Sequence, residues 1–153
     1  MVPHLSRRSL LSAGALGVAG MAGCIEHFEQ AIYLGGVRIE NRADTASSFD
    51  VEITKEDVLV HDATYTDVPA DPGGDEGIYA DCEWPNQERG EFEVAIREAD
   101  ADDWSITASS ESDRDEFCQL CRVEYTGDDL RFFWEDCNDW RAGDDDPLCR
   151  YGF

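Results

Sequence analysis

Apolar and polar residues alternate with a period of two along most of the chain after residue 36. The alternation is clear over residues 37–40, 49–54 and 90–97. Successive side chains of a strand point to opposite faces, so such a segment buries one face of a sheet. Glycine and proline turns separate the segments, and no stretch has a convincing helical pattern. The chain is therefore restricted to an all-β fold in which sheets pack face to face.

Seven or eight short strands are predicted, joined by turns at residues 55–57 and 69–75. In the strand at 90–97, Phe92, Val94 and Ile96 are expected to face inward. In the segment after it, Trp104, Ile106 and Ala108 share one face. The predicted strands cover residues 37–41, 49–54, 58–65, 78–84, 90–97, 104–108, 117–125 and 130–134. We expect one antiparallel β-sandwich, because about 130 residues suffice for a single core.

The last predicted hairpin allows its register to be derived from its turn. If Gly127 and Asp128 form a two-residue loop, the numbers of facing residues add to 255. Cys118 then faces Cys137, and this register predicts a cross-strand disulfide. The same register pairs Tyr125 with Leu130, Val123 with Phe132, and Cys121 with Trp134.

The first 23 residues have the composition of an export signal. Arg7 and Arg8 precede about a dozen weakly apolar residues, as in a signal peptide of the twin-arginine type. The apolar run falls short of the roughly 20 residues that cross a bilayer. Residues 21–24, Met-Ala-Gly-Cys, resemble a lipobox, which implies cleavage before Cys24 and lipid on its thiol. The alternative is an ordinary cleavage site that leaves Cys24 as a free thiol.

This organisation predicts three parts: the signal at 1–23, a tether at 24–35, and a β-sandwich domain at 36–153 that ends in a cysteine-rich hairpin and tail. The membrane is the expected partner, reached through lipid on Cys24. A single lipid group holds a protein only marginally, so a second chain or a second contact with the membrane is expected.

The mature chain is extremely acidic. Residues 1–23 contain two arginines and no acid, so residues 24–153 carry ten basic and 35 acidic residues, a net charge of −25. So many like charges repel at ordinary ionic strength and are screened over about 3 Å at about 1 M salt. No basic patch is present to bind phosphates, which argues against nucleic acid. Disorder is the alternative reading of the acidity, and the aromatic content and strand pattern oppose it.

A twin-arginine lipoprotein signal on such an acidic domain resembles the surface proteins of haloarchaea. The segments at 37–41, 49–65 and 90–97 are similar to the strand layout of immunoglobulin-like domains in haloarchaeal lipoproteins, over roughly residues 36–135. The resemblance implies an immunoglobulin-like sandwich on the extracytoplasmic face of the membrane. The chain departs from antibody domains in one respect, because Trp84 follows Cys82 by only two residues.

Five cysteines remain after Cys24, and disulfides are the favoured interpretation outside the cytoplasm. Besides the Cys118 pair with Cys137, we expect Cys121 to pair with Cys82 or Cys149, which leaves one thiol. The alternative is a zinc or thiol-redox module built on Cys118, Cys121, Cys137 and Cys149, with a CxxC motif at its start. Residues three apart in a strand point to opposite faces, which disfavours a common metal.

Other candidate residues give weaker signals. His61 is predicted to be a surface residue or a satisfied one, and the acid runs at 100–103 and 144–146 could offer oxygen ligands to calcium. Trp134, Trp140 and Tyr151 could form an aromatic patch, although packing is the simpler interpretation.

No nucleophile motif or phosphate-binding loop is present in the sequence, so neither a catalytic residue nor a cofactor is predicted. The expected function is that of a noncatalytic envelope module, with a protein or glycan as its possible partner.

Overall fold

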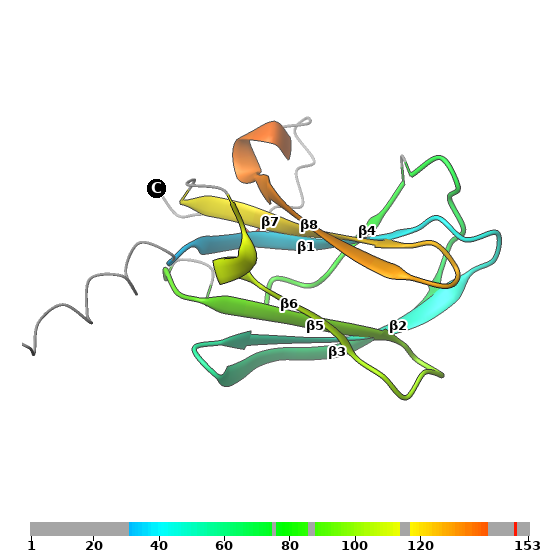
Figure 1. Cartoon of the computed structure of the whole chain (residues 1–153), viewed down its shortest axis with the longest axis horizontal. Coiled ribbons are helices and arrows are strands. Elements are labelled where there is room, and N and C mark those ends of the chain that lie inside the picture. The colour runs from blue at the N-terminus through cyan, green and yellow to red at the C-terminus, as the bar shows by residue number, and fades with distance from the viewer. Residues whose placement is uncertain (1–30, 75, 86–87, 114–116, 141–148, 150–153) are drawn as a thin grey trace, which may run out of the picture.

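The computed structural model describes residues 31–74, 76–85, 88–113, 117–140 and 149 (Figure 1). The predicted signal, with Arg7 and Arg8, lies outside these residues, and so does Cys24. In the part of the chain that is described, no helix is long and apolar enough to span a membrane.

Eight strands in the described residues form two sheets of four strands each, which confirms the predicted all-β sandwich. The first sheet has the order β4-β1-β7-β8 and the second the order β3-β2-β5-β6. The strands are β1 Tyr33–Asn41, β2 Ser47–Lys55, β3 Val58–Val68, β4 Ile78–Tyr79, β5 Phe92–Glu98, β6 Ser105–Ala108, β7 Cys118–Tyr125 and β8 Leu130–Asp136, with 3₁₀ turns η1 Ser109–Glu111 and η2 Cys137–Trp140.

The first strand begins earlier than predicted. The tether was expected to run to residue 35, but β1 starts at Tyr33, and Ile32 forms a bridge with Gly90. A shift in register between Leu34 and Gly36 lets the strand continue through its glycine pair. The sandwich therefore includes the last part of the predicted tether.

β1 and β7 form the one departure from an antiparallel arrangement among the described pairs. They run parallel from Tyr33 opposite Cys118 to Asn41 opposite Tyr125. Parallel neighbours need a long crossover connection, and here the whole second sheet and β4 lie between them in the chain. Apart from the short β4, the first sheet is thus built from the beginning and the end of the described chain.

The β7–β8 hairpin has the predicted register. Val123 faces Phe132, and Cys121 faces Trp134. Gly127 adopts a positive φ of 98°, and the amide of Thr126 bonds to the carbonyl of Asp129 at 3.0 Å. The two-residue loop therefore fixes which side chains meet, as expected from its sequence.

The core lies between the two sheets. Large side chains that are fully buried there include Phe49, Ile53, Phe92 and Ile96 from the second sheet. Phe49 contacts the ring of Tyr125 edge-on, with centroids 5.2 Å apart. Aromatic and branched side chains from both sheets therefore form one continuous core.

β6 turns a different face inward from the one that its apolar residues suggested. Ile106 is 55% exposed, whereas Thr107 is buried. The Thr107 hydroxyl accepts a bond from the indole of Trp134 at 3.1 Å and donates to Glu111 at 3.2 Å. Because its hydroxyl is satisfied, a threonine can lie inside while an isoleucine faces solvent.

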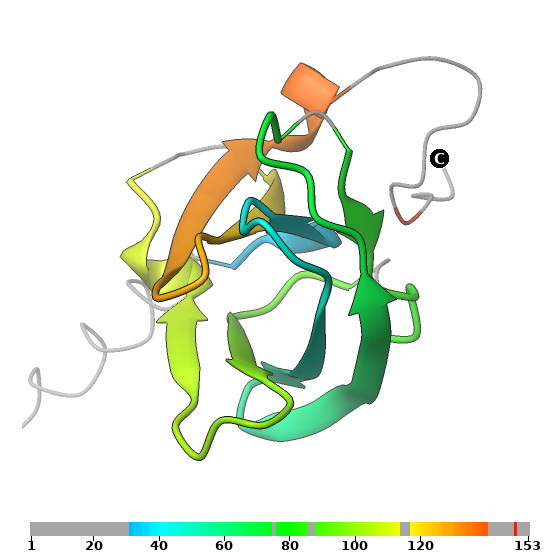
Figure 2. The same cartoon turned by 90° about the vertical axis from the view of Figure 1, so that its right-hand side faces the viewer.

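The sides of the sandwich are joined by hydrogen bonds between the two sheets. On one side, the Trp134–Thr107 bond joins β8 to β6. On the other, the hydroxyl of Tyr65 in β3 accepts a bond from the amide of Asp81 just after β4, at 2.9 Å. Figure 2 shows these pairs of edge strands on opposite sides of the molecule.

Candidate functional site

Cys118 and Cys137 form the disulfide that the hairpin register predicts. Their Cα atoms are 5.5 Å apart, and the bond joins the start of β7 to η2. This distance is in the middle of the range found for disulfides. The first predicted pairing is therefore present in the structure.

The second predicted pairing is wrong. Cys82 bonds to Cys149, with Cα atoms 5.5 Å apart, and Cys121 is a buried free thiol. Cys121 faces the core from the centre of β7, three residues after Cys118 and on the opposite face of the strand. Desolvation by burial, and then the charge of Glu135, raise the pKa of this thiol above its usual range.

The four cysteines of the zinc alternative do not lie together as thiols. Three of them are in disulfides, and the fourth, Cys121, points into the core. Among the described residues, which include the acid run at 100–103, no group of three or more potential ligands is arranged to hold a metal. The acid run at 144–146 lies outside those residues.

The first half of β1 has an edge that a short segment and the Cys82–Cys149 disulfide cover. The amide of Ala80 donates to the carbonyl of Val37 at 2.9 Å, and the amide of Cys149 donates to the carbonyl of Gly35 at 2.8 Å. The buried indole of Trp84 donates to the carbonyl of Leu34 at 3.0 Å. These donors satisfy carbonyls that would otherwise template pairing with another strand.

This edge cover explains why β4 is shorter than predicted. The strand was expected over residues 78–84 but consists of Ile78–Tyr79. After Tyr79 the segment turns so that Trp84 can enter the core. Sequence alternation did not reveal this, because the segment serves β1 through single hydrogen bonds rather than through a ladder.

His61 is a buried residue with partners. Its Nε2 lies 3.0 Å from the hydroxyl of Tyr65, its Nδ1 lies 3.2 Å from a carboxylate oxygen of Glu83, and its ring meets that of Trp84 edge-on. Burial raises the pKa of the Tyr65 phenol above its usual value. His61 is thus a buried residue under the edge cover and not a surface residue; its Nε2 has a hydrogen-bond partner, whereas its Nδ1 has only the nearby Glu83 carboxylate.

The outer face of the first sheet carries a network of arginines and glutamates that the sequence analysis missed. Glu40, only 2% exposed, lies within 3.4 Å of guanidinium nitrogens of Arg38, Arg42 and Arg122. Arg122 also bonds to Glu124, and to Glu135 at 2.7 Å. Burial disfavours the charge on Arg122, but the bonds to these glutamates outweigh it and raise its pKa.

Aromatic rings flank this network in one row across the sheet. The register aligns Tyr79 of β4 with Arg38, Arg38 with Arg122, and Arg122 with Phe133 of β8. The Arg38 guanidinium lies 5.8 Å from the ring centre of Tyr79, and the Arg122 guanidinium lies 4.3 Å from the ring centre of Phe133. Such cation–π contacts stabilise the planar groups on the surface of the sheet, so the network and its flanking rings form one row across the outer face.

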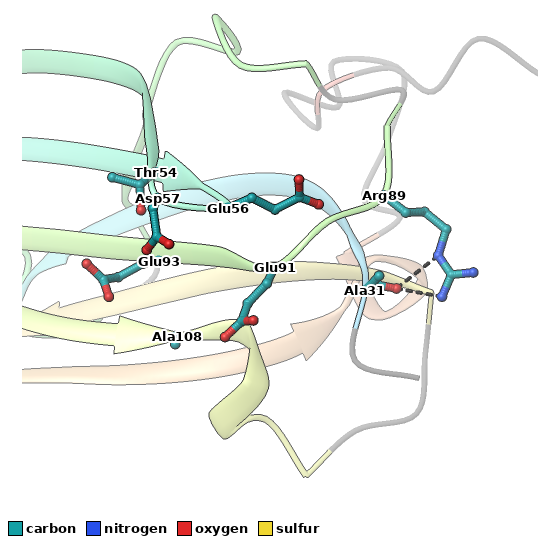
Figure 3. A pocket seen from close by; sticks show the side chains of 8 residues that line it. All are labelled: Ala31, Thr54, Glu56, Asp57, Arg89, Glu91, Glu93 and Ala108. Atoms are coloured by element: carbon teal, nitrogen blue, oxygen red, sulfur yellow. Dashed lines mark hydrogen bonds between the residues drawn. The ribbon is translucent and has the colours of Figure 1, made fainter. Parts of the chain in front are cut away.

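A cavity lies at the end of the sandwich where β1 begins (Figure 3). It has a volume of about 440 Å³. The guanidinium of Arg89 donates to the carbonyl of Ala31 at 2.9 Å and lies 4.6 Å from the ring centre of Phe117. The lining residues are Ala31, Thr54, Glu56, Asp57, Arg89, Glu91, Glu93 and Ala108.

The cavity is acidic, with four carboxylates around it in Figure 3. None of them is buried, and on a chain with 35 acidic residues their number does not define a ligand. The cavity is therefore an open acidic recess at the end of the sandwich where β1 begins.

The comparison with known proteins gives no family. No family model matches the chain, and no curated protein matches it. Of the predicted aromatic patch, Trp134 packs against the core, Tyr151 lies outside the described residues, and the side chain of Trp140 does too.

Proposed function

We propose that the chain is a noncatalytic lipoprotein, held on the extracytoplasmic face of the cell membrane through lipid on Cys24. It serves there as a binding or structural module of the cell envelope, with an envelope protein or glycan as its partner. The resemblance to haloarchaeal surface proteins and the net charge of −23 support a salt-rich setting.

The division of the six cysteines carries this proposal. Four are joined in two disulfides and one is a thiol buried in the core, so Cys24 is the cysteine left over, in the sequence position that the lipobox motif marks. Disulfides persist in oxidising compartments and are rare in the cytosol. The disulfides and the predicted signal thus support export independently.

The test is the intact mass of the protein extracted from membranes, before and after alkylation. We expect a chain that begins at Cys24 and carries lipid, with no thiol alkylated in the folded state and one alkylated after denaturation without reductant. A Cys121→Ala variant is the matched control and should show none in either state.

Two results would overturn the proposal. An unprocessed N-terminus would remove the anchor. Four or five thiols reacting without reductant would show that the disulfides do not form in the cell, and would favour the zinc or thiol-redox module instead.

A further inference from the structure

Exposed apolar side chains gather at the end of the sandwich where β1 begins. Val58 is 63% exposed, Leu59 is 52% exposed, and Phe117 is 66% exposed. The first two follow the β2–β3 turn, and the carbonyl of Phe117 accepts a bond from the amide of Tyr33 at 2.6 Å. Figure 1 shows this turn and the starts of β1 and β7 at the same end of the molecule.

The opposite end has a different surface. Its turns connect β1 to β2, β5 to β6, and β7 to β8 (Figure 1). Among the described residues of these turns, no large apolar side chain is exposed. Aspartates dominate these turns, as at residues 100–103 and 128–129. The two ends of the domain therefore differ in their affinity for an apolar environment.

Only a short length of chain separates the proposed anchor from the apolar end. Cys24 precedes Ile32 by eight positions, and eight residues extend to no more than about 28 Å. The nine residues of β1 alone span about 30 Å at about 3.3 Å per residue, so the tether reaches no further than about the length of that strand. Lipid on Cys24 would hold this end of the sandwich, and not the end with the β1–β2, β5–β6 and β7–β8 turns, next to the bilayer.

We infer that this end docks onto a zwitterionic lipid surface, with Val58, Leu59 and Phe117 entering the headgroup region. The inference rests on the proposed function, because lipid on Cys24 brings the end to the membrane. It supplies the second contact that a marginal single anchor requires. Arg89, which bonds to Ala31 and lies over the Phe117 ring, fixes that ring relative to the first strand.

The acidic cavity at this end determines which lipids the end accepts. Glu56, Asp57, Glu91 and Glu93 lie at the same end, and they repel an anionic bilayer at low ionic strength. At about 1 M salt the Debye length falls to about 3 Å, and this repulsion is screened. Docking on anionic lipid should therefore strengthen with salt, which is the opposite of binding by a basic patch.

The test uses the lipidated protein, purified from membranes and reconstituted into phosphatidylcholine vesicles at about 1 M salt. Amide hydrogen exchange is compared with that of the mature Cys24→Ser chain free in solution. We expect at least several-fold slower exchange around residues 56–60 and 117–120 on vesicles, and unchanged exchange in the turn at 126–129. Equal exchange at residues 56–60 in the two samples would overturn the docking.

Variants test the side chains directly. Val58→Ser with Leu59→Ser, and separately Phe117→Ser, should reduce the protection on vesicles several-fold. Ile106→Ser is the matched control, because Ile106 is equally exposed but lies on β6. Near-UV circular dichroism in solution checks that each variant folds. Protection that persists in both apolar variants, or that Ile106→Ser removes as well, would also overturn the docking.

The intact mass of the same reconstituted sample separates the two proposals. A chain without lipid at Cys24 would overturn the proposed anchor and the docking with it. A lipidated chain without protection at the apolar end would overturn the docking alone.

Discussion

The indole nitrogen of Trp84 donates a hydrogen bond to the carbonyl oxygen of Leu34, 50 residues earlier in the chain, at 3.0 Å. Both residues are buried, so water cannot replace the bond. Together with the amides of Ala80 and Cys149, this bond closes the edge of β1.

Replacing Trp84 by phenylalanine should therefore destabilise the domain. The change leaves the buried carbonyl of Leu34 without its donor, and we expect a loss of about 1–3 kcal/mol in the free energy of unfolding. Guanidinium denaturation at high salt measures it. Trp104→Phe is the control, because Trp104 lies partly exposed beneath Arg97; equal losses in the two variants would contradict a special role for Trp84.

The two disulfides should contribute unequally to stability. Cys82 and Cys149 are 67 residues apart, and Cys118 and Cys137 are 19 apart. Loop entropy in the unfolded chain predicts losses of about 4 kcal/mol and about 3 kcal/mol when each pair is replaced by serines. Removal of the first pair also releases Cys149 from the β1 edge, so aggregation in light scattering should rise in that variant alone. A larger loss from the short loop would contradict this order.

The Cys121 thiol should make stability fall at alkaline pH. Its pKa is raised in the folded state, because burial disfavours the thiolate, so only the unfolded chain loses this proton just above its ordinary pKa of about 8.5. The contribution is fully present below that pH, and about 1.4 kcal/mol of it is lost by about pH 9.5. Denaturation curves at about pH 8.5 and about pH 9.5 should show a smaller decrease in the free energy of unfolding for Cys121→Ala than for the unaltered chain. Equal decreases would show that the thiol is accessible in the fold.

Glu40 should be the most important acid of the arginine network. Glu40→Gln leaves three guanidinium groups without their shared buried carboxylate, and breaking such a buried pair costs about 3–5 kcal/mol. Glu135→Gln removes a partner of Arg122 that is 19% exposed, so its loss should be smaller. Chemical denaturation of both variants ranks them, and the reverse order would refute the central position of Glu40.

Salt should be required for the tertiary structure. The excess of 35 acidic over 12 basic residues opposes the compact state when charges are not screened. We expect near-UV circular dichroism to disappear on dialysis from about 1 M salt to millimolar salt, because the Debye length lengthens several-fold. A cooperative unfolding transition retained at millimolar salt would count against a halophilic protein.

Local patterns predicted the parts of this fold that depend on local geometry. The alternation that puts Phe92 and Val94 inside, and the turn that sets Cys118 opposite Cys137, both act over a few residues. The partner of Cys82 could not be derived in this way, because it depends on how the end of the chain returns to β1.

The arginine network and the cavity could not be predicted from the sequence for the same reason: both depend on contacts that are not local. Arg38 lies on β1, Arg42 directly follows it, and Arg122 lies on β7; only the parallel pairing makes these two strands neighbours, and no periodicity in the sequence encodes that pairing. The cavity likewise combines a hairpin turn, the chain before β1 and the start of β5. Sequence patterns identify strands and turns, whereas these sites depend on the strand order.

The parallel pair β1·β7 has a consequence for how the protein is made. Arg122 meets Glu40 across 82 residues of chain, and contacts of such separation form slowly, because a long loop must close first. Chains emerge from their N-terminus during synthesis, so β1 exists long before its partner strand. A nascent chain that ends before residue 118 lacks β7 and β8, half of its first sheet, and native folding has to wait for the final quarter of the polypeptide.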